Sequence, residues 1–172
     1  MTFYIDGYNV IHHSSRLRSL AMHDFEVARD ELVVKVSRFC GVSGQHATIV
    51  FDGRGRQAEP SMPDRAAPGF QVIYSPTHYS ADTVIERLVY SAANRRNIIV
   101  VSADRGLREL CRGLGALVMD SSNFLATVNE SLEDGRERLS RHYVSGGLAR
   151  IEDGLDEKTL DSLDELKSKL EP

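Results

Sequence analysis

Aspartates stand where three apolar runs of this sequence end. Asp6 follows Phe3-Tyr4-Ile5, Asp52 closes the run IVFD, and Asp104 closes IIVVSAD. An unpaired charge beside an apolar run is costly, so each acid needs a reason to be there. If the runs are parallel strands, their carboxyl ends share one edge of a sheet, where open α/β sheets bind ligands. The spacing therefore predicts that the three aspartates lie together.

A helix expected to begin at Ser80 adds two more acids to this group. Asp82 falls in its first turn, and Glu86 lies four residues further on, on the same helix face. Carboxylates that gather in this way repel one another and take up protons unless they share a cation. Mg²⁺ or Mn²⁺ fits, because such hard ions take oxygen ligands and keep water molecules for chemistry. The chemistry that this favours is metal-assisted attack on a phosphodiester.

Each of these acids also has a purely structural explanation. An Asp directly after a strand is a common helix N-cap or turn residue. Asp52 stands in the segment Asp-Gly-Arg-Gly, which is ordinary turn chemistry, and Asp82 is favourable near any helix N-terminus. The functional interpretation therefore depends on the coincidence of three strand ends and one helix start, and not on any single residue.

The elements that must position these acids alternate along the chain. Short apolar runs separated by helical patterns predict an α/β fold with a mostly parallel central sheet flanked by helices. The predicted strands are Thr2–Ile5, ATIVFDG, FQVIYS, NIIVVSAD and ALVM. The predicted helices run from the cap Asp24 to Gly41, from Ser80 to about Arg95, from about Arg105 to Leu114, and onward from Ser121-Ser122. A loop is predicted before Asp24, and residues 53–69, rich in Gly, Pro and Arg, are predicted to form an exposed loop.

Length and composition predict one main domain. The chain has 172 residues, which suits a domain at 1–143, a linker at 144–154 and an acidic helix at 155–172. The formal net charge is -4, and eight acids against three lysines lie in residues 152–172. The rest of the chain is close to neutral, which neither requires nor excludes an anionic partner.

The two cysteines, Cys40 and Cys111, form neither a disulfide framework nor a zinc ligand set, which favours a reducing compartment. No signal peptide and no apolar run of membrane-spanning length is evident in the sequence. We therefore expect a cytoplasmic protein without a membrane partner.

Four blocks of the sequence resemble a known family. YIDGYNVIH, IVFDG, YSPTHYSADTVIERLV and IIVVSADRGLRELCRGLGA are similar to the NYN domain in its YacP-like branch, with the same order and spacing over roughly residues 2–126. The opening Asp-Gly-Tyr-Asn followed later by Ser-Ala-Asp is the more specific part. The resemblance implies a PIN-like, Rossmann-like three-layer fold and a metal-dependent endoribonuclease. It also implies association with ribosomes and cleavage of messenger RNA.

The resemblance assigns roles to particular residues. The first aspartate of the family falls on Asp6, its asparagine on Asn9, its Ser/Thr-Ala-Asp aspartate on Asp82, the following glutamate on Glu86, and its strand-four aspartate on Asp104. The sequence departs from the branch at Thr83, where an acid is usual, and at Leu107-Arg108, where a Glu-Gln pair is usual.

Other residues near the predicted edge are candidates for contact with RNA. Arg54, Arg56 and Arg65 lie in the predicted loop and suit phosphate, since a guanidinium pairs with phosphate through two parallel hydrogen bonds. Their alternative is a solvated loop. Arg105, like Arg108, flanks Asp104 and is expected to contact either RNA or an acid of the protein.

Aromatic and small polar residues at the edge also have two interpretations each. Tyr8, with Tyr74 and Tyr79, is expected either to stack on unpaired bases or to pack as a core or turn residue. Ser102 is a candidate for RNA binding, for holding a carboxylate or metal-bound water, or simply for ending a strand. Asn9 is expected to orient a water or to bind the scissile phosphate, and its alternative is a local turn.

The predicted function is hydrolysis of single-stranded or ribosome-associated RNA, whether messenger, transfer or ribosomal. Asp6, Asp82 and Asp104 would hold Mg²⁺ or Mn²⁺, with Asn9, Asp52 and Glu86 assisting. The alternative is a catalytically inactive adaptor that keeps the fold and binds RNA or the ribosome. The retained carboxylates argue against it, because an acidic hole repels RNA.

Two other enzyme classes fit less well. A phosphatase of the haloacid dehalogenase type needs a second acid where Tyr8 stands. A nucleotide-binding enzyme would need a glycine-rich phosphate loop, which the sequence lacks.

Overall fold

Five parallel strands form the centre of the fold. The computed structural model describes residues 1–53, 60–61 and 66–145, with the side chains of 60–61 and 142–145 left aside. The parallel strands are β1 (Thr2–Asp6), β2 (His46–Phe51), β4 (Phe70–Tyr74), β5 (Ile98–Val101) and β6 (Leu117–Met119). A two-residue strand, β3 (Pro60–Ser61), pairs antiparallel with β4, and the sheet order is β3-β4-β2-β1-β5-β6. The predicted mostly parallel sheet and its five strands are confirmed, and β3 is an addition inside the predicted 53–69 loop.

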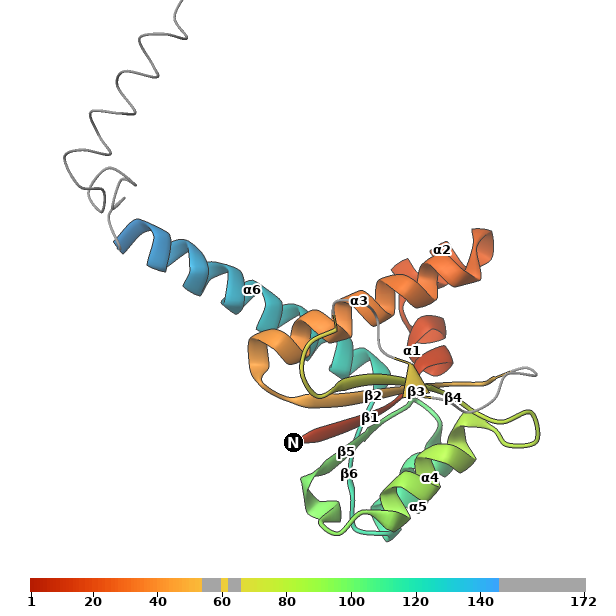
Figure 1. Cartoon of the computed structure of the whole chain (residues 1–172). Coiled ribbons are helices and arrows are strands. Elements are labelled where there is room, and N and C mark those ends of the chain that lie inside the picture. Colours follow the sequence, from red (N-terminus) through yellow and green to blue (C-terminus); the bar gives the residue numbers. More distant parts are fainter. Residues whose placement is uncertain (54–59, 62–65, 146–172) are drawn as a thin grey trace, which may run out of the picture. The chain divides into compact units, whose positions relative to one another are not determined.

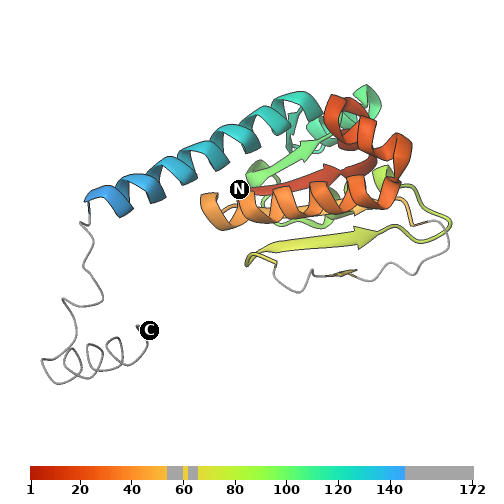
Figure 2. The same cartoon turned by 90° about the horizontal axis from the view of Figure 1, so that it is seen from above.

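The first strand of the chain lies in the middle of the sheet. β1 pairs with β2 on one side and with β5 on the other, so that Ile5 lies level with Ile49 and Val101. Strands covered on both faces are built from nearly continuous apolar residues, which explains the runs in the sequence. Because these strands share one direction, the residues after each of them leave the sheet at a common edge (Figure 2).

Helices cover both faces of the sheet, which gives the expected three layers (Figure 1). The helices are α1 (Gly7–His13), α2 (Ser15–His23), α3 (Phe25–Ser43), α4 (Ala81–Ser91), α5 (Arg105–Gly113) and α6 (Ser121–Ser145), with a short 3-10 turn η1 (Arg95–Asn97). α1, α2, α3 and the beginning of α6 lie on one face, and α4 and α5 lie on the other.

Each face of the sheet has its own apolar core. On the α3 face, the rings of Phe3, Phe39 and Phe124 contact one another with centroid distances of 5.6 to 6.1 Å. On the α4 face, Ile85 and Val89 pack with residues of β5 and α5. The two cores fix the sheet from both sides and hold its carboxyl edge in place.

Three of the predicted element boundaries are wrong. The stretch predicted as a loop before Asp24 forms α1 and α2. The helix capped by Asp24 passes through Gly41 and ends at Gly44, whose φ of 67° gives the left-handed conformation of a helix C-cap. α4 ends at Ser91 and not near Arg95.

The last described helix, α6, overlaps the start of the predicted linker. The chain divides into two units, Met1–Glu133 and Asp134–Pro172, and the described part of the second is the last portion of α6. α6 continues to Ser145, through the first two positions of the segment 144–154. Its remaining positions and residues 155–172 lie outside the described residues, as do Arg54, Arg56 and Arg65, and the domain division remains a prediction. Within the described ranges, no helix is both long and apolar enough to cross a membrane.

Candidate active site at the carboxyl edge of the sheet

Asp6 lies at the centre of the edge and is buried, with 8% of its surface exposed. One carboxylate oxygen accepts a hydrogen bond from the Asn9 backbone N–H (3.0 Å), which caps α1, and the other accepts from the Ser102 hydroxyl (3.2 Å). These two bonds offset part of the cost of burying a charge beside an apolar strand. The pKa of Asp6 is nevertheless raised to about 6, mainly by burial and in part by the neighbouring charges of Asp82 and Asp52, while the two hydrogen bonds act in the opposite direction.

Ser102 joins Asp6 to the strand-four aspartate. Its hydroxyl donates to Asp6 and accepts from the Asp104 backbone N–H at 3.1 Å. Asp104 in turn caps α5, accepting from the Leu107 backbone N–H at 2.8 Å. Ser102 is fully buried, so its position supports the carboxylate-holding interpretation and gives no support to direct RNA contact.

Asn9 ties three segments of the chain together at this edge. Its side-chain oxygen accepts from the Ala103 backbone N–H (2.7 Å) and from the Ser121 hydroxyl (2.8 Å). That oxygen is therefore engaged in holding the loop after β5 and the start of α6. A role toward water or phosphate would have to use its Nδ2 group.

Asp52 holds the beginning of α4. Its Oδ1 accepts from the Ala81 backbone N–H at 2.7 Å, and the Ser75 hydroxyl approaches the same oxygen at 3.5 Å. Ser75 also accepts from the Gly53 backbone N–H at 3.1 Å. A side chain at position 53 would collide with the carbonyl oxygen of Ser75, so this turn requires glycine. Asp52 is thus a residue that positions the helix carrying Asp82.

Asp82 is the least restrained of the acids. It lies in the first turn of α4, half-buried, and no donor among the described residues hydrogen-bonds its carboxylate. Burial raises the pKa of Asp82, and the charges of Asp104, Asp52 and Glu86 raise it in addition. The charges of Glu86 and Asp82 also act on the buried thiol of Cys111, whose pKa is raised to about 11, mainly by burial.

The structure thus brings five predicted acids into one electrostatically coupled region: Asp6, Asp52, Asp82, Glu86 and Asp104. Within the described ranges, no three His, Cys, Asp or Glu side chains lie close enough together to enclose an ion. The carboxylate oxygens fit Mg²⁺ or Mn²⁺, because such ions often bind only one or two carboxylates directly and keep several water molecules as their other ligands. Asp82, with its unengaged oxygens, is the residue most available for direct contact with such an ion.

The three tyrosines predicted near the edge differ in their contacts and exposure. Tyr8 packs against Phe25 and Phe51 at centroid distances of 5.1 and 5.2 Å, and Tyr74 stacks on Phe51. These contacts favour the core interpretation of both rings, whereas Tyr79 is 41% exposed.

Both arginines after Asp104 have acidic partners within the protein. Arg105 pairs with Glu109 at 3.5 Å, and Arg108 pairs with Asp120 at 3.2 Å. The ion-pair interpretation therefore accounts for both, although exposed Arg105 remains accessible to solvent.

Two polar residues of this edge were not predicted from the sequence. Asp120 directly follows β6, as Asp6 follows its strand, so the rule that found the other acids would have found it too. It caps α6 through the Ser122 backbone N–H (2.9 Å) and is neutralised by Arg108. Ser121, fully buried against Asn9, carries no signal in the sequence, because its role depends on a partner 112 residues away.

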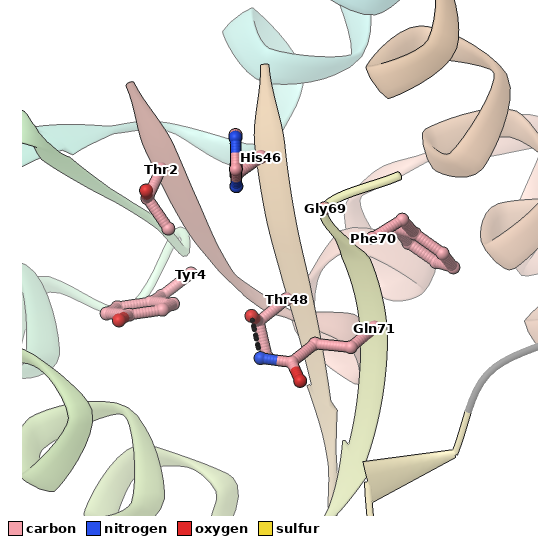
Figure 3. A pocket seen from close by; sticks show the side chains of 7 residues that line it. All are labelled: Thr2, Tyr4, His46, Thr48, Gly69, Phe70 and Gln71. Carbon is pink, nitrogen blue, oxygen red and sulfur yellow. Dashed lines mark hydrogen bonds between the residues drawn. The ribbon is translucent and has the colours of Figure 1, made fainter. Parts of the chain in front are cut away.

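The site is distinct from a cavity of about 320 Å³ at the opposite ends of the strands. Figure 3 shows its lining, which includes Thr2 and Tyr4 of β1, His46 of β2, and a Gln71 side chain that donates to Thr48. None of the five acids lines this cavity. The candidate chemistry therefore belongs to the carboxyl edge.

Comparison with known proteins gives the same relationship in sequence and in structure. The sequence matches the model of the YacP-like NYN domain over residues 3–168. It is 29% identical over 143 residues to the Bacillus subtilis protein described as uncharacterised protein YacP, covering 82% of each chain.

Crystal structures of Rae1 (YacP) from Bacillus subtilis are similar to this chain. One, of a mutant, has a TM-score of 0.68 at 25% identity and covers 96% of this chain and 99% of its own. A second has a TM-score of 0.70 at 23% identity, with 98% and 95% covered, and supports the fold. An NYN domain implies a nuclease-like function related to RNA. Because the family model spans nearly the whole sequence, the chain belongs to the YacP-like NYN domain family.

Proposed function

We propose that this protein is a metal-dependent endoribonuclease that hydrolyses phosphodiester bonds of single-stranded or ribosome-associated RNA. The observation that carries the proposal is the coupling of Asp6, Asp82 and Asp104 at one edge, with the pKa of Asp6 raised to about 6. Caps alone do not need several acids in one region, whereas a cation shared by them offsets their repulsion. The family relationship supports the same class of reaction.

The residues divide the work in this proposal. Asp82 would bind Mg²⁺ or Mn²⁺ directly, and Asp6 and Asp104 would bind it directly or through water. Such an ion supplies an activated water and stabilises the leaving oxygen of the phosphodiester. Asp52 and Asn9 act as positioning residues, since their oxygens hold the start of α4 and the loop after β5.

Hydrolysis forms a bond from the water oxygen to phosphorus and breaks the bond to the leaving ribose oxygen. The water loses a proton on attack, and the leaving oxygen gains one. A carboxylate with a raised pKa, such as Asp6, exchanges protons nearer neutral pH than an ordinary aspartate does. The buried hydrogen bond from Ser102 keeps its oxygens oriented toward the edge.

The test is calorimetric titration of Mn²⁺ into the wild type and Asp82→Asn, followed by addition of labelled single-stranded RNA. We expect Mn²⁺ binding and Mn²⁺-dependent cleavage in the wild type, and loss of both in the variant with an unchanged circular dichroism spectrum. Asp30→Asn, which removes an exposed acid of α3, is the matched control and should behave as the wild type. Absence of metal binding at millimolar Mn²⁺, even with RNA present, would contradict the proposal and favour the inactive adaptor.

Ribosome-associated RNA is tested separately. If Mn²⁺ binds but isolated RNA stays intact, the same variants are assayed on translating ribosomes. Cleavage there by the wild type, and not by Asp82→Asn, would support the ribosome-associated substrate.

A further inference from the structure

Two aromatic rings lie along α4, Tyr90 on the helix and Tyr79 directly before its N-cap, and each contacts a guanidinium group. Arg87 lies over the Tyr79 ring at 4.2 Å from its centroid, and Arg95 lies over the Tyr90 ring at 5.3 Å. Arg87 and Tyr90 are three residues apart on the helix and therefore neighbours on one face. These four residues, here called the α4 strip, form a continuous row in which aromatic and cationic side chains alternate.

The α4 strip faces solvent. Tyr90 is 67% exposed and Tyr79 is 41% exposed, although a large ring gains free energy from burial. The exposed residues of α4 are Arg87, Tyr90 and Ser91, and the partly buried Glu86, four residues before Tyr90, borders the same face. The charges of Asp82 and Glu86 also act on the buried thiol of Cys111 in α5.

The far end of the α4 strip is rigidly held. Arg95 donates to the backbone carbonyl oxygens of Tyr90 (2.7 Å) and Leu114 (3.4 Å). These bonds fix the guanidinium beneath the Tyr90 ring and so limit the conformations of that ring. The same Arg95 lines a hollow of about 370 Å³ together with Asn94, Arg96 and Gly115.

The near end of the α4 strip adjoins the candidate active site. Tyr79 directly precedes Ser80, the N-cap of α4, and the next residue, Ala81, donates its backbone N–H to Asp52. Tyr79 is therefore the ring of the α4 strip nearest to the carboxylates. Exposed rings backed by cations are stacking surfaces for unpaired bases, and arginines neutralise the phosphates between them.

We propose that the α4 strip binds the single-stranded RNA that extends from the carboxylate site, with bases stacked on Tyr79 and Tyr90 and phosphates paired with Arg87 and with Arg96 at the hollow. This inference rests on the proposed function for the identity of its ligand. The alternation of rings and guanidinium groups suits a nucleotide repeat better than a folded protein surface.

The test is fluorescence anisotropy with 5′-fluorescein-labelled decauridylate in EDTA, so that binding is measured without metal and without cleavage. We expect Tyr90→Ala to weaken binding about tenfold, since stacking on one aromatic ring contributes on that order. Tyr90→Phe keeps the ring and should bind as the wild type does. A labelled ten-base-pair RNA duplex should show no difference between these proteins, because its bases are already stacked.

Arg87→Gln tests the electrostatic part. It should reduce the slope of log affinity against log salt concentration by about 0.7, the contribution of one phosphate on a single strand. Arg18→Gln is the matched control, because it removes an exposed arginine from α2, which covers the other face of the sheet. Unchanged affinity in Tyr90→Ala and an unchanged slope in Arg87→Gln would overturn the proposal and leave a protein partner as the reason for the exposed rings.

These outcomes separate the two proposals. Ring-dependent binding of decauridylate, without Mn²⁺-dependent cleavage of either isolated or ribosome-associated RNA, would support the α4 strip and contradict the nuclease. Mn²⁺-dependent cleavage with no effect of the two variants on RNA binding would support the nuclease and overturn the α4 strip.

Discussion

The buried carboxylate of Asp6 makes a prediction about stability and pH. Its pKa in the folded protein is about 6, against 3.8 in the unfolded chain, so the folded state binds more protons between these values. The contribution of Asp6 to the free energy of unfolding is therefore fully present below pH 3.8 and is lost as the pH rises through 6. At 1.36 kcal/mol per unit of pKa shift, this loss is roughly 3 kcal/mol. Other acids of the protein with lowered pKa values would act in the opposite direction, so the variant isolates the contribution.

Asp6→Asn should raise the melting temperature at pH 7 in EDTA, and the difference from the wild type should disappear near pH 4. The amide can still accept from Asn9 and donate to Ser102, so both hydrogen bonds survive the change. Thermal unfolding by circular dichroism across this range measures the effect, with Asp30→Asn as an exposed control. A lower melting temperature at pH 7 would mean that the charged form of Asp6 stabilises the fold.

At the residue scale, the sequence predicted which acids lie at the edge but not which hydrogen bonds each of them makes. The strand-end rule brought Asp6, Asp52 and Asp104 to one edge, and the structure places them there as caps and hydrogen-bond acceptors as well. The two interpretations weighed from the sequence are therefore compatible, since a cap uses a carboxylate oxygen and leaves room for a second role. The partners of Asn9 could not be inferred, because Ala103 and Ser121 are about a hundred positions away in the chain.

At the scale of elements, α1 was missed because it begins without a break after β1. Gly7 follows the strand immediately and is buried, so the usual loop between strand and helix is absent. A Cβ at position 7 would lie 2.8 Å from Cγ2 of Ile49 and closer still to the ring of Phe51. The glycine of the Asp-Gly-Tyr-Asn motif is therefore a packing requirement that lets α1 begin against β2.

Gly7→Ala should lower the free energy of unfolding by about 1 to 3 kcal/mol, the usual effect of overpacking a core. Urea denaturation measures this change. Gly113→Ala at the end of α5 is the control, because nothing lies within 4 Å of its added Cβ, and its stability should be unchanged or slightly higher. If Gly7→Ala matched that control, the close approach of α1 to β2 would be adjustable.

The end of α3 shows why glycine alone does not define a helix terminus. Gly41 lies within the helix between Cys40 and Val42, while Gly44 adopts the left-handed conformation that ends it. The sequence offers both glycines, and only the backbone conformation distinguishes them. The strands were easier to predict, because burial on both faces leaves a continuous apolar run.

At the scale of the whole molecule, the beginning of α6 packs against the first strand of the chain. Phe124 on α6 is fully buried and contacts both Phe3 of β1 and Phe39 of α3. These contacts therefore join three elements, α6, β1 and α3, that are far apart in sequence. The loss of this ring should be felt by the α3 core as a whole.

Phe124→Ala should lower the free energy of unfolding by about 3 to 5 kcal/mol, since it leaves a cavity at the centre of the aromatic cluster. Leu139→Ala on the same helix removes a side chain that is 64% exposed and should change stability little. Because the chain has no tryptophan, its unfolding in urea is monitored by circular dichroism. Equal effects of the two variants would mean that the cluster tolerates the cavity.

The central position of β1 has a consequence for protein synthesis. Asp6 leaves the ribosome about a hundred residues before β5 and before Ala103 and Ser121, the partners of Asn9. At roughly 5 to 20 residues per second, translation takes several seconds to supply them. The nascent chain therefore cannot assemble this edge until the hundred or so residues after Asp6 have been made, and any activity of the site begins only after the start of α6 has emerged.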